Sequence, residues 1–131
     1  LTASVPVGLY RLIAFPPTID RDMLVVLPVP PSMRPFHSRW LPLLKPVAGV
    51  AGDLVCRHEN TLLLNGESFG PIITMTQGRP VPVALAEGVC VMIHEGQVFL
   101  ASRVPRSLDS RYYGSVPMAS LTAAAVPIWT W

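Results

Sequence analysis

Short apolar runs, separated by proline, glycine and polar residues, form the hydrophobic pattern of this chain. The clearest runs are LYRLIA at 9–14 and MLVVL at 23–27. Apolar runs of about four to eight residues between such breaks are typical of strands. No helical period continues for long, because fifteen prolines and nine glycines interrupt the sequence. The pattern therefore predicts a mostly β chain.

Further strands are expected at 43–51, 53–57, 61–64, 91–93, 97–101 and 125–131. Two hairpins are expected, one turning at His58-Glu59-Asn60 and the other at Glu95-Gly96, and Asn65-Gly66 marks a further turn. Residues 118–125 could form one or two helical turns, with Ser120 as a cap.

Two proline-rich segments, 28–46 and 71–82, are expected to be irregular. Proline cannot donate to a sheet ladder, so the first segment should not enter a sheet interior. Long loops in compact domains often carry function. The length of 131 residues predicts one domain, 1–131, with its own core.

Charge and hydropathy narrow the classes of partner. Half of the residues are apolar and the net charge is only +2, with the basic residues scattered. We therefore expect an ordered domain that does not bind nucleic acid. No apolar stretch reaches the roughly 18–20 residues of a membrane helix. The chain begins at Leu1 without methionine, so we expect a segment upstream, which could be a signal or an anchor.

Lys45 is the single lysine beside nine arginines. It lies in LPLLKPVAGVAG, and the nearest acidic residue along the chain is Asp53. Arginine keeps its proton in proteins, whereas a buried lysine can lose it. Lowering a lysine pKa to 7–8 takes roughly 3–4 kcal/mol, which apolar walls can supply. The alternative is a lysine whose amine reaches out to solvent.

No glycine-flanked G-x-S-x-G elbow occurs, and the three histidines, His37, His58 and His94, fall in loops or turns. A serine–lysine pair is therefore a simpler candidate than a serine–histidine–aspartate triad. Ser4 precedes Pro6, which stiffens the chain after it. The alternative is an ordinary loop serine.

The segment RSLDSRYYG at 106–114 brings Ser107, Asp109, Ser110 and Arg111 together. An aspartate and an arginine this close can form a charge-assisted network that braces a site. The alternative is a polar loop beneath an aromatic lid. Cys56 and Cys90 show no metal-ligand spacing. We favour a disulfide between them over two buried thiols, and we expect no metal or cofactor.

These segments, in this order, resemble the bacterial type I signal peptidase family, and within it the conjugative-transfer, TraF-like branch. TASVPVGLY resembles the nucleophile segment, LLKPVAGVAGD the general-base segment and SLDSRYYGSVP a conserved box of the family, while PIWTW resembles the C-terminus of the conjugative type. The resemblance implies a mostly β, compact, LexA-like fold with long loops and an N-terminal membrane anchor.

The resemblance also implies roles for individual residues. Ser4 would be the nucleophile and Lys45 the general base, and the oxyanion hole would use the Ser4 amide and the Thr2 hydroxyl. Ser107 would orient the lysine amine, with Asp109 and Arg111 bracing the site. The sequence departs from the general enzymes in having one residue between Ser4 and proline, Pro46 after the lysine, Ala101-Ser102 in place of Gly-Asp, and no large extra domain. These departures favour the compact conjugative type.

We therefore expect a serine endopeptidase on the periplasmic face of the bacterial inner membrane. Its partners would be the membrane, through the upstream anchor, and a protein substrate, the leader peptide of a pilin-like or secreted precursor. Some conjugative relatives also join pilin ends into a ring. The alternatives are a housekeeping signal peptidase, a self-cleaving repressor and a non-enzymatic β binding module.

Overall fold

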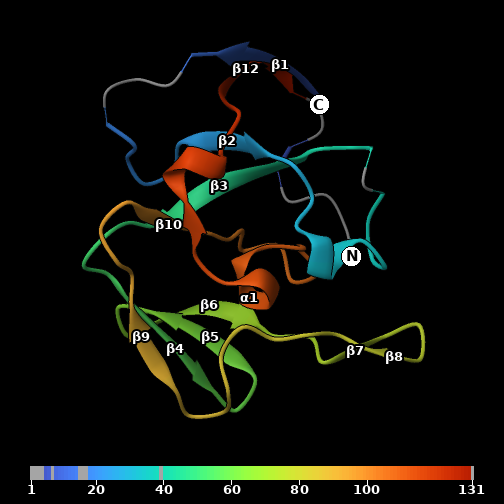
Figure 1. The fold of residues 1–131 in the computed structure, drawn as a ribbon, viewed down its shortest axis with the longest axis vertical. Helices are drawn as coiled ribbons and strands as arrows, with labels where there is room; N and C mark the ends of the chain where they lie inside the picture. The colour runs from blue at the N-terminus through green and yellow to red at the C-terminus, as the bar shows by residue number, and fades with distance from the viewer. Residues whose placement is uncertain (1–4, 7, 15–17, 39, 131) are drawn as a thin grey trace.

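The computed structural model describes residues 5–6, 8–14, 18–38 and 40–130. Antiparallel strands make up most of the regular structure, in a six-stranded sheet, a four-stranded sheet and a small hairpin (Figure 1). The prediction of a mostly β chain is confirmed. No helix in the described part of the chain has the length and hydrophobicity to cross a bilayer.

The six-stranded sheet runs in the order β1, β12, β2, β3, β10, β11. Its strands are β1 (Gly8–Ile13), β2 (Leu24–Leu27), β3 (Leu43–Gly49), β10 (Gln97–Leu100), β11 (Val116–Pro117) and β12 (Ala123–Thr130). The central strands β2 and β3 consist largely of apolar residues because both of their faces are largely buried. They hold the middle of the sheet.

The four-stranded sheet runs in the order β6, β5, β4, β9. Its strands are β4 (Leu54–His58), β5 (Thr61–Leu64), β6 (Glu67–Pro71) and β9 (Cys90–Met92). The expected hairpin between β4 and β5 is present, and Glu59 and Asn60 turn it with φ values of 47° and 58°. Left-handed backbone at both turn positions matches the twist of the flanking strands.

The remaining elements are short. They are the hairpin of β7 (Met75–Thr76) and β8 (Arg79–Pro80), the helix α1 (Ser110–Tyr113), and the 3-10 turns η1 (Pro31–Met33) and η2 (Met118–Ser120). The segment 71–82, expected to be irregular, thus contains a small hairpin that turns at Gln77 and Gly78. Figure 1 shows α1 between the two larger sheets.

The predicted hairpin of 91–93 with 97–101 is wrong. β9 pairs with β4 in the four-stranded sheet, whereas β10 pairs with β3 and β11 in the six-stranded sheet. The turn at Glu95–Gly96 is closed by a bond from the Gln97 amide to the His94 carbonyl, 3.1 Å. This turn therefore carries the chain from one sheet to the other.

The prediction that residues 28–46 avoid the sheet interior is also wrong at its C-terminal end, because Pro46 lies in the interior strand β3. The Val47 amide donates to the Met23 carbonyl and the Val47 carbonyl accepts the Asp22 amide, so both groups face the β2 side of the strand. The nitrogen of Pro46 therefore faces the β10 side. On that side the Pro46 carbonyl accepts the Ala101 amide at 3.2 Å, and the ladder with β10 shifts register and ends at Leu100, so no ladder bond requires an N–H at Pro46.

The helical turns predicted for 118–125 are present only as η2, because β12 begins at Ala123. Ser120 does not cap a helix; its hydroxyl donates to the Pro117 carbonyl at 2.7 Å. Three consecutive alanines favour helix locally. Here they form strand because Ala124 and Ala125 are buried and pair with β2.

The core lies between the two larger sheets and around α1. Among its most deeply buried members, each no more than 2% exposed, are Val25, Met33, Val47, Val55, Leu62, Val98 and Leu100. Because these side chains come from both sheets and from η1, burial of the core holds the sheets together.

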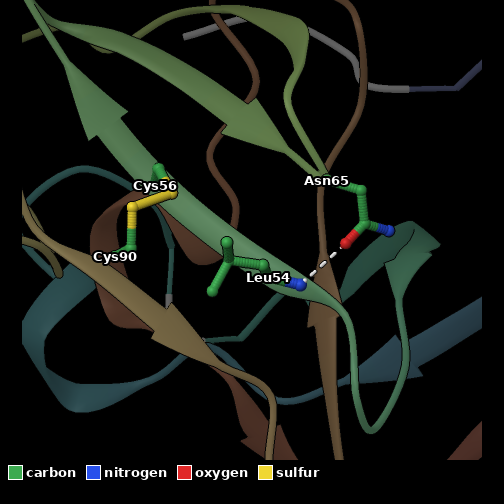
Figure 2. Close-up of a disulfide and its surroundings, with 4 residues drawn as sticks. All are labelled: Leu54, Cys56, Asn65 and Cys90. Carbon is green, nitrogen blue, oxygen red and sulfur yellow. Dashed lines mark hydrogen bonds between the residues drawn. A yellow bond between two sulfur atoms is a disulfide. The ribbon is translucent and has the colours of Figure 1, made fainter.

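A disulfide joins Cys56 of β4 to Cys90 of β9, directly across the strand pair (Figure 2). Their Cα atoms are 4.0 Å apart. At the end of the same sheet, the Asn65 side chain accepts a hydrogen bond from the Leu54 amide at 2.8 Å. The bridge fastens the edge strand β9 to β4.

A buried carboxylate, Asp53, joins three turns. It accepts a bidentate pair from Arg21, at 2.5 and 3.2 Å, and further bonds from the Val50 amide and the Asn65 side chain. Burial alone would raise the pKa of Asp53, but these bonds outweigh it and leave the pKa below its ordinary value. The lowered pKa means that the bonds stabilise the fold above about pH 4 and that this contribution is lost as pH falls.

We expect Asp53→Asn to destabilise the protein by about 1–3 kcal/mol at pH 7, because the charge-assisted bonds are lost. Urea unfolding measures the change, with the exposed Asp20→Asn as the matched control. The difference between wild type and Asp53→Asn should shrink towards pH 3. A difference that stays constant from pH 7 to pH 3 would contradict this role for the carboxylate.

Replacing both cysteines by serine should lower the free energy of unfolding by about 2–4 kcal/mol, because the bridge spans 34 residues of chain. Urea titrations of the wild type and the double variant, each with and without reductant, measure this change in the free energy of unfolding. Reductant should shift only the wild-type curve. Coincident curves for oxidised wild type and the double variant would show that the bridge adds no stability.

Candidate functional site

Lys45 lies in the middle of β3, opposite Val25 of β2, and is only 5% exposed. Leu43 and Val47, two positions away on the same strand, are buried on the same side. The Lys45 amine donates to the Ser107 hydroxyl at 3.4 Å. The chain's single lysine thus has its amine inside the protein, beside a buried serine.

Ser107 precedes α1, in a loop that folds back on the end of β10. Asp109 caps α1, and its carboxylate accepts the Arg111 amide at 3.0 Å. The Arg111 guanidinium forms an ion pair with the same carboxylate at 2.5 Å, and both side chains are fully buried. Capping by Asp109 and this ion pair hold the loop in one conformation.

The Arg111 guanidinium also joins the two sheets. It donates to the Phe69 carbonyl of β6 at 2.6 Å and to the Ser102 carbonyl at 2.9 Å. The Ser102 amide in turn donates to the Asp109 carboxylate at 3.2 Å. One buried ion pair therefore determines how the 102–111 segment lies against β6 and beside Lys45.

Burial lowers the pKa of Lys45 to about 8. The negative charge of Asp109 opposes this fall, and the positive charge of Arg111 adds to it. Burial also raises the pKa of Asp109, against the opposing effects of Arg111 and of the hydrogen bonds that the carboxylate accepts. An amine with a pKa near 8 can exchange a proton at neutral pH, which an ordinary lysine does poorly.

Of the residues singled out from sequence, the structure brings Lys45, Ser107, Asp109 and Arg111 together. Ser4 and Thr2 lie outside the described residues. Cys56 and Cys90 lie on the four-stranded sheet and are not part of this cluster. Among the residues that the structure describes, no group of histidine, cysteine or acidic side chains is arranged to hold a metal ion.

Sequence reasoning gave no role to Ser110, Tyr113 or the Phe69 carbonyl. The Ser110 hydroxyl is buried and accepts the Leu100 amide at 3.0 Å, which ties α1 to β10. Burial raises the pKa of the Tyr113 phenol well above its ordinary value. Ser110 was visible in the SLDSRYYG segment, but a backbone carbonyl such as that of Phe69 gives no sequence signal.

Known proteins resemble this chain along its whole length. A conjugal transfer protein TraF of Agrobacterium fabrum is 28% identical over 147 aligned positions, covering 99% of this chain and 80% of that protein. A conjugal transfer protein TraF of Agrobacterium tumefaciens is 31% identical, with the same coverage. A crystal structure of a signal peptidase I from Enterococcus faecalis superposes with a TM-score of 0.47 at 20% identity, over 81% of this chain and 95% of that one.

The family described as signal peptidase, peptidase S26, matches residues 1–131. The match covers the segments around Ser4 and Lys45 and the SLDSRYYG segment, on which the resemblance was based. This chain belongs to the S26 signal peptidase family and is distantly related to the conjugal transfer protein TraF.

Proposed function

We propose that this chain is the catalytic domain of a serine endopeptidase, with Ser4 as nucleophile and Lys45 as general base. The observation that carries the proposal is the buried Lys45 amine, with its pKa near 8, beside the Ser107 hydroxyl. Membership of a peptidase family supports it. Burying an ammonium costs free energy that an apolar side chain would avoid. A buried lysine at this position therefore favours a functional role over a purely structural one.

In the proposed reaction the Ser4 hydroxyl oxygen attacks the scissile carbonyl carbon and its proton passes to the neutral Lys45 amine. With a pKa near 8, about a tenth of Lys45 is neutral at pH 7. The ammonium then gives that proton to the leaving amine as the peptide bond breaks. Water, deprotonated by Lys45, next hydrolyses the acyl ester and regenerates Ser4.

The neighbouring residues position these two. Ser107 accepts a hydrogen bond from the Lys45 amine. This bond would keep the lone pair of the Lys45 nitrogen directed toward Ser4. The buried pair of Asp109 and Arg111 would keep Ser107 in place through α1 and its cap. The Ser4 amide and the Thr2 hydroxyl would donate to the developing oxyanion.

The relatives support a more specific proposal for the substrate. Two matched proteins are conjugal transfer proteins, so we propose leader-peptide removal from a pilin precursor or another exported transfer protein. The reaction would take place at the periplasmic face of the inner membrane, with an upstream segment as anchor. Aminolysis of the same acyl ester by a chain end would give a cyclic pilin in place of hydrolysis.

Cleavage of pilin-type leader peptides tests the two assigned residues. Ser4→Ala should abolish cleavage, and Lys45→Met should lower kcat by about 100- to 10,000-fold, the usual contribution of a general base. The exposed Ser32→Ala is the matched control and should keep full activity. If either Ser4→Ala or Lys45→Met is folded and keeps its rate, the dyad is wrong. If the wild type cleaves no leader, also when it is fused to a membrane-spanning helix, a non-enzymatic binding module becomes the better interpretation.

The pH profile of kcat/KM should rise with pH and level off with a midpoint near 8, because only neutral Lys45 can accept the Ser4 proton. A profile that is flat between pH 6 and pH 10 would mean that Lys45 is not the titrating base.

Ser107→Ala should lower kcat with little change in KM, as expected of a residue that orients the base.

A further inference from the structure

Two arginines lie beside a threonine near the candidate site. Arg106 directly precedes Ser107, and its guanidinium donates to the Thr76 hydroxyl at 3.4 Å. Thr76 pairs directly with Arg79 across the β7–β8 hairpin. Directly paired residues place their side chains on the same face of the ladder. Arg79 and Arg106 therefore both lie beside Thr76, on the same face of the hairpin.

Thr76 and Arg79 also line a small cavity. It is lined by Thr76, Gln77 and Arg79 of the hairpin and by Pro35 and Phe36 of the loop between β2 and β3. Its volume of about 100 Å³ is enough for several water molecules or for one carboxylate group. The lining thus combines apolar side chains with hydroxyl, amide and guanidinium groups.

Neither arginine has a counter-ion among the described residues. The described ion pairs involve Arg21, Arg57 and Arg111. The nearby Arg103 has other contacts, because its guanidinium donates to the Ser68 carbonyl at 3.0 Å and lies over the Phe69 ring. Arginine presents several N–H groups in a fixed plane, which matches the two oxygens of a carboxylate.

We propose that Arg79 and Arg106, with Thr76, form a subsite for an acidic side chain of the substrate polypeptide. This inference rests on the proposed peptidase function. Arg106 and Ser107 are consecutive, and the Ser107 hydroxyl contacts the Lys45 amine, so the subsite lies close to the reacting groups. An extended peptide advances about 3.3 Å per residue, so the position of the acidic residue relative to the scissile bond is found by moving it along the peptide.

We assign the ligand of this subsite to a peptide side chain, and not to a lipid headgroup, because the subsite includes a hollow. A hollow lined by apolar side chains and one guanidinium suits one acidic side chain, with its methylene stem against Pro35 and Phe36 and its carboxylate on Arg79. A flat anionic surface would leave this hollow unfilled. Because the arginines are exposed, the effect on affinity should be moderate and should weaken with salt.

The test uses leader peptides that carry a single Glu or Gln, moved from five residues before the scissile bond to five residues after it. At one or two adjacent positions, Glu should lower KM about 3- to 10-fold relative to Gln, with kcat unchanged, and 0.5 M NaCl should shrink the difference. Arg79→Gln and Arg106→Gln should remove it without affecting the Gln peptides. Arg11→Gln, an exposed arginine of β1, is the matched control.

Equal KM values for Glu and Gln peptides at every position would overturn the subsite while leaving the peptidase assignment intact. If no peptide is cleaved, the proposed function fails, and binding of the labelled Glu and Gln peptides then decides the subsite. Equal binding by wild type and by Arg79→Gln would overturn it. A loss of binding to anionic phospholipid vesicles in both arginine variants, without any peptide preference, would assign the arginines to a membrane surface instead.

Discussion

The buried ion pair between Asp109 and Arg111 is the interaction on which the arrangement of this molecule depends. Both side chains are fully buried, and the guanidinium also holds carbonyls of β6 and of the segment after β10. A buried pair of this kind is costly to break, because removing one partner leaves an uncompensated charge. The pair thereby joins the two sheets and holds Ser107 beside Lys45.

The chemical character of Lys45 follows from that placement. The opposite charges of Asp109 and Arg111 act on the amine in opposite directions, so burial is the largest influence on the Lys45 pKa. β3 supplies the apolar surroundings, and the 102–111 segment covers the amine with polar groups that are already engaged with one another. A fold that buries a lone lysine in this way keeps a proton acceptor available near neutral pH.

Local signals in the sequence predicted local structure well. Short apolar runs bounded by prolines or turn residues predicted β1, β2, β4 and β5, and the isolated lysine with the SLDSRYYG segment identified the residues that cluster in the structure. Partners distant in sequence could not be predicted. No residue near Glu95–Gly96 indicates that β9 and β10 belong to different sheets. Pro46 is accommodated in β3 because the β10 ladder ends beside it. The carbonyls that hold Arg111 carry no sequence signal either.

Direct titration of the Lys45 amine tests the central claim, that the fold itself lowers the pKa of this group. Since Lys45 is the single lysine, protein labelled with ¹⁵N-lysine gives one side-chain amine resonance, which can be followed from pH 6 to pH 11. The account predicts a midpoint near 8 in the folded protein and a return to about 10.4 in urea. A midpoint near 10.4 in the folded state would contradict it, because the amine would then be protonated and solvated at neutral pH.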